Sequence, residues 1–179
     1  DHLGSFFKPT TLEPRDVVLF GFGRIGRLLA RELIVQEGSG HQLRLRGVSV
    51  RSIDAASLHK RASLLKIDSV HGDFPGTITV DEENLALIIN GRPVYFIPAP
   101  DPTKADYTAY GINNALLIDN SGAFRDETAL SKHLQGKGVD KVLLTAPGKG
   151  IPNIVHGVNQ SDVTKSERII SAASCTTNA

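Results

Sequence analysis

The chain has 179 residues, 40% of them hydrophobic and 22% charged, with a formal net charge of +1 and one cysteine. This length is enough for the core of one domain. The balanced charge gives no electrostatic reason to expect binding to nucleic acid or to a membrane surface. No apolar run approaches the length of a membrane-spanning segment. One cysteine excludes an intramolecular disulfide framework, so we expect a cytoplasmic protein, and no group of residues predicts a metal site.

The first 15 residues contain Phe6-Phe7 and two prolines, and we expect them to form an N-terminal extension or linker rather than part of the core. An apolar strand is predicted over residues 16–20. It runs directly into the segment Gly21-Phe22-Gly23-Arg24-Ile25-Gly26-Arg27, and residues 28–33 follow with helical spacing.

This segment is a G-x-G-x-x-G sequence in the strand–turn–helix context that dinucleotide-binding folds require. Gly21 allows the tight turn, Gly23 lets a pyrophosphate approach the backbone, and Gly26 lets the helix pack close to the strand. The phosphates would lie on the N–H groups at the helix N-terminus. Glycine-rich turns are common, so a purely structural turn stays open, but the context favours dinucleotide binding.

The rest of the chain alternates strand-like and helix-like segments after a glycine-containing break at residues 36–41. Strands are expected over residues 43–50, 76–80, 85–90, 93–97, 116–118, 142–144 and 169–170, and helices over residues 55–66 and 126–135. Asn90-Gly91 is a hairpin-type turn signal. The alternation predicts an α/β fold, a Rossmann-type doubly wound and mainly parallel sheet with a β-hairpin insertion.

In such a fold, ligands bind outside the carboxyl ends of the strands. The residues that follow these ends are the candidate cofactor-binding residues: Arg51, Ser52 and Asp54, then Ser121 and Gly122, then Thr145. A strand-capping turn also explains each of them alone, and their common location favours a site. A carboxylate beside the adenosine ribose repels a 2′-phosphate whereas an arginine pairs with it, so this set leaves NAD and NADP both open.

The only cysteine, Cys175, lies between Ser174 and Thr176, where the last expected strand gives way to the first turn of a helix. A thiol at a helix N-terminus is shifted toward the thiolate, which is the nucleophilic form. A lone cysteine is usually a small buried hydrophobe. The neighbouring hydroxyls and the strand-to-helix position favour a catalytic nucleophile instead.

Taken together, the glycine motif and the run Ala173-Ser174-Cys175-Thr176-Thr177-Asn178 closely resemble the glyceraldehyde-3-phosphate dehydrogenase family. Other stretches resemble the same family in the same order, namely Asp68-Ser69-Val70-His71-Gly72, Ile89-Asn90-Gly91, Asp101-Pro102-Thr103, His133-Leu134-Gln135-Gly136, Thr145-Ala146-Pro147 and Gly157-Val158-Asn159. The resemblance covers residues 16–179, nearly the whole chain.

The resemblance implies a phosphorylating enzyme that uses NAD or NADP, with Arg24 and Ile25 joining the glycines in the cofactor site. It implies that Cys175 attacks the aldehyde of glyceraldehyde 3-phosphate and that inorganic phosphate cleaves the resulting thioester to 1,3-bisphosphoglycerate. Ser174 and Thr176 would contact the substrate or the attacking phosphate.

The resemblance also implies a general-base histidine in a second domain, and none of the six histidines of this chain matches it. We therefore expect residues 16–173 to form the dinucleotide-binding domain and residues 174–179 to begin a catalytic domain whose remainder is absent. The chain alone is expected to be inactive, and its parent is expected to be a homotetramer.

The chain departs from the family after the second strand. Members often have Asn-Asp there, with the Asp on the ribose hydroxyls of NAD, whereas this chain has Arg51-Ser52 and places Asp54 two residues further on. The difference favours NADP use, unless a change of loop length lets Asp54 take the usual role. Pro100 likewise stands where members often have an arginine.

Three alternative functions stay open. An erythrose-4-phosphate dehydrogenase of the same family would share these motifs, because substrate choice depends largely on residues outside this chain. A semialdehyde dehydrogenase also pairs such a domain with a catalytic cysteine, but its sequence around both motifs looks different. A non-catalytic dinucleotide-binding module would hold Cys175 as a passive core residue, and rapid alkylation of the thiol near neutral pH would distinguish the enzymes from it.

Overall fold

The structure is a computed structural model that describes residues 14–38 and 42–173, so the expected nucleophile Cys175 and its neighbours Ser174 and Thr176 lie outside the described residues. An eight-stranded sheet forms its centre, with the strand order β10-β9-β8-β1-β2-β7-β6-β5. The strands are β1 (Arg15–Phe20), β2 (Leu43–Val50), β5 (Ile78–Asp81), β6 (Ala86–Ile89), β7 (Arg92–Pro98), β8 (Ala115–Asp119), β9 (Val139–Leu144) and β10 (Ile169–Ser171).

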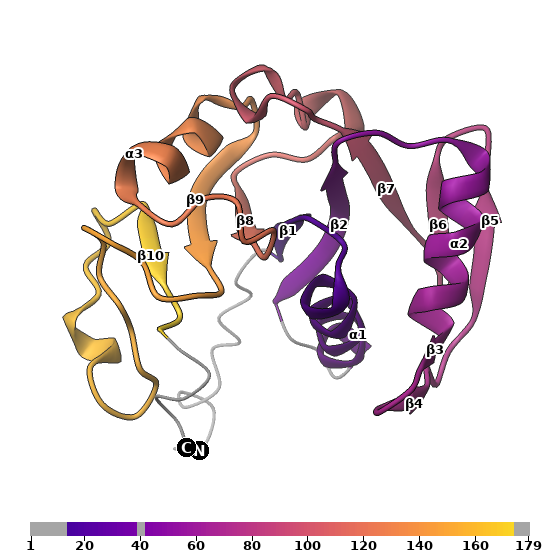
Figure 1. The fold of residues 1–179 in the computed structure, drawn as a ribbon, viewed down its shortest axis with the longest axis horizontal. Coiled ribbons are helices and arrows are strands. Elements are labelled where there is room, and N and C mark those ends of the chain that lie inside the picture. Colours follow the sequence, from indigo (N-terminus) through magenta and orange to yellow (C-terminus); the bar gives the residue numbers. More distant parts are fainter. Residues whose placement is uncertain (1–13, 39–41, 174–179) are drawn as a thin grey trace, which may run out of the picture.

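The strands from β10 to β7 run parallel, and β6 and β5 extend the sheet antiparallel at one edge. Helices α1 (Arg24–Gly38) and α2 (Ala55–Lys66) lie beside the half of the sheet formed by β1, β2 and β5–β7, and α3 (Glu127–Leu130) lies beside β9 (Figure 1). This architecture confirms the predicted Rossmann-type, mainly parallel sheet with a hairpin insertion.

The predicted hairpin turn joins β6 to β7. Ile89 pairs with Arg92, and the two residues between them, Asn90 and Gly91, have φ values of 50° and 81°. Two consecutive positive φ values are typical of the tight turns that match the twist of a hairpin, and Asn-Gly is the sequence that tolerates them best. The turn therefore returns the chain to the parallel part of the sheet as β7.

The core occupies both faces of the sheet, and the central strand β1 contributes to each. Val17, Val18 and Leu19 are fully buried. Because successive strand residues point to opposite faces, Val17 and Leu19 join the cluster that contains Leu58 of α2, whereas Val18 joins the cluster that contains Leu130 of α3. A strand buried on both faces explains the unbroken apolar run in the sequence.

Two features of the strands differ from the sequence-based expectation. Strand β1 begins one residue earlier than expected, because the Arg15 N–H donates a hydrogen bond to the carbonyl of Gln42 at 2.6 Å and so extends the pairing with β2. A second, two-stranded sheet pairs β3 (Ile67–Asp68) with β4 (Gly72–Asp73) in antiparallel fashion. Strands of two residues carry no periodic signal, so pattern reasoning does not detect them.

The helix expected over residues 126–135 is wrong in its second half. The α-helix ends at Leu130, and a 3-10 helix continues over Ser131–Gln135. Residues three apart share a face in the tighter helix, which is consistent with Leu130 and His133 both being buried. Within residues 14–38 and 42–173, no helix combines the length and the apolarity needed to cross a membrane.

Removal of a core side chain tests the position of β8. Leu117 is fully buried in β8, so Leu117→Ala is expected to lower the free energy of unfolding by about 2–5 kcal/mol through lost burial and the cavity that is left. Leu64→Ala on the exposed side of α2 is the matched control and should cost less than about 1 kcal/mol. Urea unfolding measures both, and equal losses would contradict the assignment.

Candidate functional site

The carboxyl ends of the parallel strands form the edge at which α/β sheets bind ligands. The chain runs from β1 outward through β2 to β7, and then returns to β8 on the other side of β1. Strands β1 and β8 pair from Val17 with Leu116 to Phe20 with Asp119. The strand order therefore reverses between them, and a ligand site is expected between the turn after Phe20 and the loop after Asp119.

The three glycines of the motif have different surroundings. Gly21 has a φ of +97°, which side chains rarely adopt, and a Cβ on Gly26 would lie 2.6 Å from both the Gly21 carbonyl oxygen and Asn120 Oδ1. Helix α1 therefore packs directly on the turn. A Cβ on Gly23 would meet no atom within 4 Å. The backbone at Gly23 is thus open at the N-terminus of α1, which fits a phosphate-bearing ligand.

A buried carboxylate, Asp119, organises the loop that faces the glycine turn. Its side chain is completely buried, and Oδ1 accepts hydrogen bonds from the Ser121 N–H at 2.9 Å and the Ser121 hydroxyl at 2.7 Å. Its backbone oxygen accepts the Thr145 N–H and hydroxyl, both at 3.1 Å. Asp119 therefore links two sequence-predicted residues that follow the neighbouring strands β8 and β9.

The other oxygen of the same carboxylate faces His133, to which sequence reasoning assigned no role in the site. His133 Nε2 and Asp119 Oδ2 are 2.9 Å apart, and both side chains are 0% exposed. The imidazole lies against Phe20 and Phe124, with ring centroids 4.5 and 5.1 Å away. Its Nδ1 is buried and has no hydrogen-bond partner among the described residues. The sequence does contain one signal for this pair, because Asp119 is a polar residue at the end of an apolar strand.

The loop after β2 contains the residues for which two explanations were open. Arg51 and Ser52 are exposed, whereas Asp54 caps α2. Asp54 Oδ1 accepts the Ser57 N–H at 2.7 Å, and Ser57 Oγ accepts the Asp54 N–H at 3.0 Å, which together form a capping box. The hydrogen bonds from Ser57 hold the pKa of the Asp54 carboxyl below its ordinary value. Capping is thus one role of Asp54, and a ribose contact stays a prediction.

The remaining sequence-predicted residues lie along the same edge. A Cβ on Gly21 would lie 3.2 Å from Ser121 Cα, so the turn and the loop touch, and Gly122 follows with a φ of +74°. Arg24 and Ile25 are exposed in the first turn of α1. The structure therefore brings together the glycine turn, Ser121, Gly122 and Thr145, and it places Arg51, Ser52 and Asp54 as a second group before α2. Their contacts to a ligand stay predictions.

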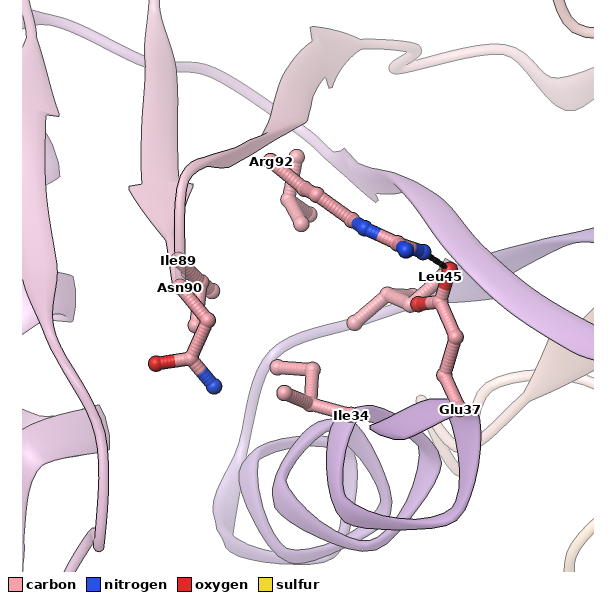
Figure 2. Close-up of a pocket in the computed structure, with 7 residues that line it drawn as sticks. Ile34, Glu37, Leu45, Ile89, Asn90 and Arg92 are labelled. Atoms are coloured by element: carbon pink, nitrogen blue, oxygen red, sulfur yellow. Dashed lines mark hydrogen bonds and ion pairs between the residues drawn. The ribbon is translucent and has the colours of Figure 1, made fainter. Parts of the chain in front are cut away.

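A cavity of about 200 Å³ lies away from this edge, where the end of α1 meets the starts of β2 and β7. Figure 2 shows Arg92 and Glu37 reaching toward each other as an ion pair, with Ile34 and Leu45 nearby. Arg92 is the first residue of β7, so the cavity belongs to the amino edge of the sheet and is not part of the candidate site. Among the described residues, no cluster of His, Cys, Asp and Glu could hold a metal ion.

Comparisons with known proteins agree with this geometry. Residues 15–127 match the family model described as glyceraldehyde 3-phosphate dehydrogenase, NAD binding domain. A glyceraldehyde-3-phosphate dehydrogenase-like protein of Pseudomonas aeruginosa is 59% identical over 168 residues, which are 93% of this chain and 36% of that protein. The glyceraldehyde-3-phosphate dehydrogenase of Zymomonas mobilis is 37% identical over 164 residues, and a chloroplastic form from Scenedesmus vacuolatus is 38% identical over 160. These two matches cover 90% and 88% of this chain. The chain therefore spans less than half of each relative, 45% of the first and 48% of the second.

The tight packing of α1 on the turn predicts that Gly26 does not tolerate a side chain. Gly26→Ala is expected to lower the free energy of unfolding by about 1–3 kcal/mol, because the new Cβ would overlap the Gly21 carbonyl oxygen. Gly23→Ala is the matched control, and its effect on stability should be within about 0.5 kcal/mol because its surroundings are open. Equal effects of the two variants in chemical denaturation would contradict the packing.

The buried pair predicts a second stability effect. His133→Phe keeps an aromatic ring between Phe20 and Phe124 but leaves Asp119 Oδ2 buried without its partner. The free energy of unfolding should fall by about 1–3 kcal/mol as a result. Ser131→Ala, in the same 3-10 helix but exposed at its hydroxyl, should change it by less than about 1 kcal/mol. An unchanged denaturation midpoint for His133→Phe would show that the pair does not stabilise the fold.

Proposed function

The chain belongs to the glyceraldehyde-3-phosphate dehydrogenase family and carries its NAD(P)-binding domain, and on that premise we propose that it serves as the cofactor half of a phosphorylating glyceraldehyde-3-phosphate dehydrogenase. The observation that carries the proposal is the glycine turn, which lies where the strand order reverses. A Cβ would meet no atom within 4 Å at Gly23, whereas at Gly26 it would overlap neighbouring atoms. This combination supports a ligand that needs close approach to the backbone.

Three groups of residues are proposed to bind different parts of the cofactor. The N–H groups that follow Gly21 and Gly23 face the pyrophosphate, in the first turn of α1 with Arg24, Ile25 and Gly26. Ser121, Gly122 and Thr145 form the side of the crevice nearer the nicotinamide, and Arg51, Ser52 and Asp54 form the adenosine side. When bound, the cofactor supplies the acceptor for the hydride that leaves the substrate carbon.

The parent's chemistry begins at Cys175, which lies just beyond the described residues. Its thiolate attacks the aldehyde carbon of glyceraldehyde 3-phosphate, loss of hydride from that carbon leaves a thioester on Sγ, and inorganic phosphate displaces the thiolate to give 1,3-bisphosphoglycerate. Ser174 and Thr176 contact the substrate or the phosphate. We propose that the general base comes from outside the portion of the relatives that these 179 residues match, and that these residues alone are inactive. The proposal also extends to a homotetrameric, cytoplasmic parent.

A calorimetric titration with NAD and NADP tests cofactor binding directly. The 179-residue chain should bind at least one of them, and Gly23→Ala should weaken that binding about tenfold or more, because a methyl group would keep the pyrophosphate off the backbone. Thr79→Ala, in the exposed face of β5, should leave the affinity unchanged. Full affinity in Gly23→Ala would contradict the assignment of the turn, and lack of binding to either cofactor would contradict the cofactor role.

A further inference from the structure

A cationic pocket lies beside the glycine turn, outside the residues assigned so far. It has a volume of about 310 Å³. One wall comes from Phe22 in the turn and Arg27 in α1, and the other comes from α2. The α2 residues in it are Ser57, Lys60, Arg61 and Leu64. Their spacing of three and four residues places them on one face of the helix, so the pocket is the crevice between the first turn of α1 and this face of α2.

The pocket carries three positive charges and no acidic side chain lines it. Arg61 is half-buried, and it forms no hydrogen bond or ion pair with any described residue. Its guanidinium lies over the ring of Phe96, whose centroid is 5.9 Å from the guanidinium carbon. Among the described residues, the Arg27 side chain makes one long hydrogen bond, which it donates to the Phe22 carbonyl at 3.4 Å. The Nε atoms of both arginines are buried without a partner among the described residues.

Two buried donors of this kind are costly to leave unpaired, because desolvation of a polar group without a hydrogen bond opposes folding. Burial lowers the pKa of the Arg61 guanidinium, and the Asp54 carboxylate acts in the opposite direction. Asp54 lies close enough to influence that charge but forms no ion pair with it, and its Oδ1 caps α2 through Ser57. The pocket is therefore suited to an anion that the described part of the chain does not supply.

The fold specifies which anion comes near. In dinucleotide-binding folds the adenosine ribose lies outside the carboxyl end of the second strand, and the group that follows this strand meets its 2′ position. Here the second strand is β2, and the loop after it leads into α2, which lines the pocket together with Phe22 of the glycine turn. Resting on the proposed function, we infer that this pocket takes the 2′-phosphate of NADP, with Arg61 as the residue that sets cofactor specificity and Lys60 and Arg27 in support.

Arg61 is better placed for selectivity than Arg51, the candidate that the sequence suggested. Arg51 is exposed, so water and salt screen its charge and reduce its contribution. Arg61 is half-buried in a crevice with Lys60 and Arg27, where the effective dielectric constant is lower and a phosphate dianion is attracted more strongly. An arginine also offers paired donors that match phosphate oxygens.

The test is a calorimetric titration of the 179-residue chain with NADP and NAD, alongside 2′,5′-ADP and 5′-AMP as probes of the adenosine end. The wild-type chain should bind NADP about tenfold or more tightly than NAD, and 2′,5′-ADP more tightly than 5′-AMP. Arg61→Met keeps an unbranched, flexible side chain close to the length of the aliphatic part of arginine and removes the charged guanidinium. It should weaken NADP binding about tenfold or more and NAD binding less than about twofold.

Three further variants complete the design. Lys60→Gln, at an exposed position that tolerates substitution, should shift the NADP-to-NAD ratio in the same direction by a smaller factor, and it keeps the test valid should Arg61→Met fail to fold. Arg51→Gln should change the ratio less than about twofold. Lys137→Gln removes the same charge at the amino edge of the sheet, where it pairs with Asp106 at 3.2 Å, and it should leave both affinities unchanged.

The outcomes separate this inference from the function on which it rests. Equal weakening of NAD and NADP by Arg61→Met would mean that the pocket serves the shared pyrophosphate, which overturns the inference and leaves the proposed function standing. An unchanged ratio in Arg61→Met, or a ratio governed by Arg51, overturns it as well. If the wild-type chain binds neither cofactor, the proposed function fails and the inference fails with it.

Discussion

A buried carboxylate at the end of β8 is the constraint on which the candidate site depends. An ionised or neutral carboxyl group with no exposed surface is tolerated only when its oxygens have partners, and Asp119 finds them in Ser121 and His133. Satisfying that one side chain fixes the loop after β8 against the turn after β1. This position of the loop leaves no room for a side chain at Gly21 or Gly26. A Cβ on Gly21 would lie against Asn120 and Ser121, and a Cβ on Gly26 would lie against Asn120.

The parts of the structure that local chemistry determines could be predicted from the sequence. Alternating strands and helices gave the parallel sheet, Asn90-Gly91 gave the hairpin, and the spacing of the glycines gave a turn whose three members have the expected surroundings. The capping role of Asp54 was also readable in principle, because an Asp followed three residues later by Ser at a helix start is a capping pattern.

The parts that depend on distant partners could not be predicted in this way. The pair of Asp119 and His133 joins residues from a strand and from a 3-10 helix, and no spacing rule relates them. The same is true of the change from α-helix to 3-10 helix after Leu130, which brings His133 into the core. The role inferred for Arg61 in cofactor choice could not be predicted either. It depends on the side chains that face α2 across the pocket, which are Phe22 of the glycine turn and Arg27 of α1.

Arg61 differs from several other arginines of the described residues because no acidic side chain pairs with it. Arg44 pairs with Asp16 and Arg92 pairs with Glu37 at the amino edge, and Arg24 lies 3.9 Å from Asp68. At the carboxyl edge, Arg61 of α2 lines the crevice beside the glycine turn, and no acidic side chain lines that crevice. A half-buried guanidinium that lacks hydrogen bonds weakens the free domain and strengthens binding of any anion that restores them. The same desolvation therefore costs stability in the free chain and supplies selectivity in the complex, which is a reason for the charge to be at this position rather than on the exposed loop after β2.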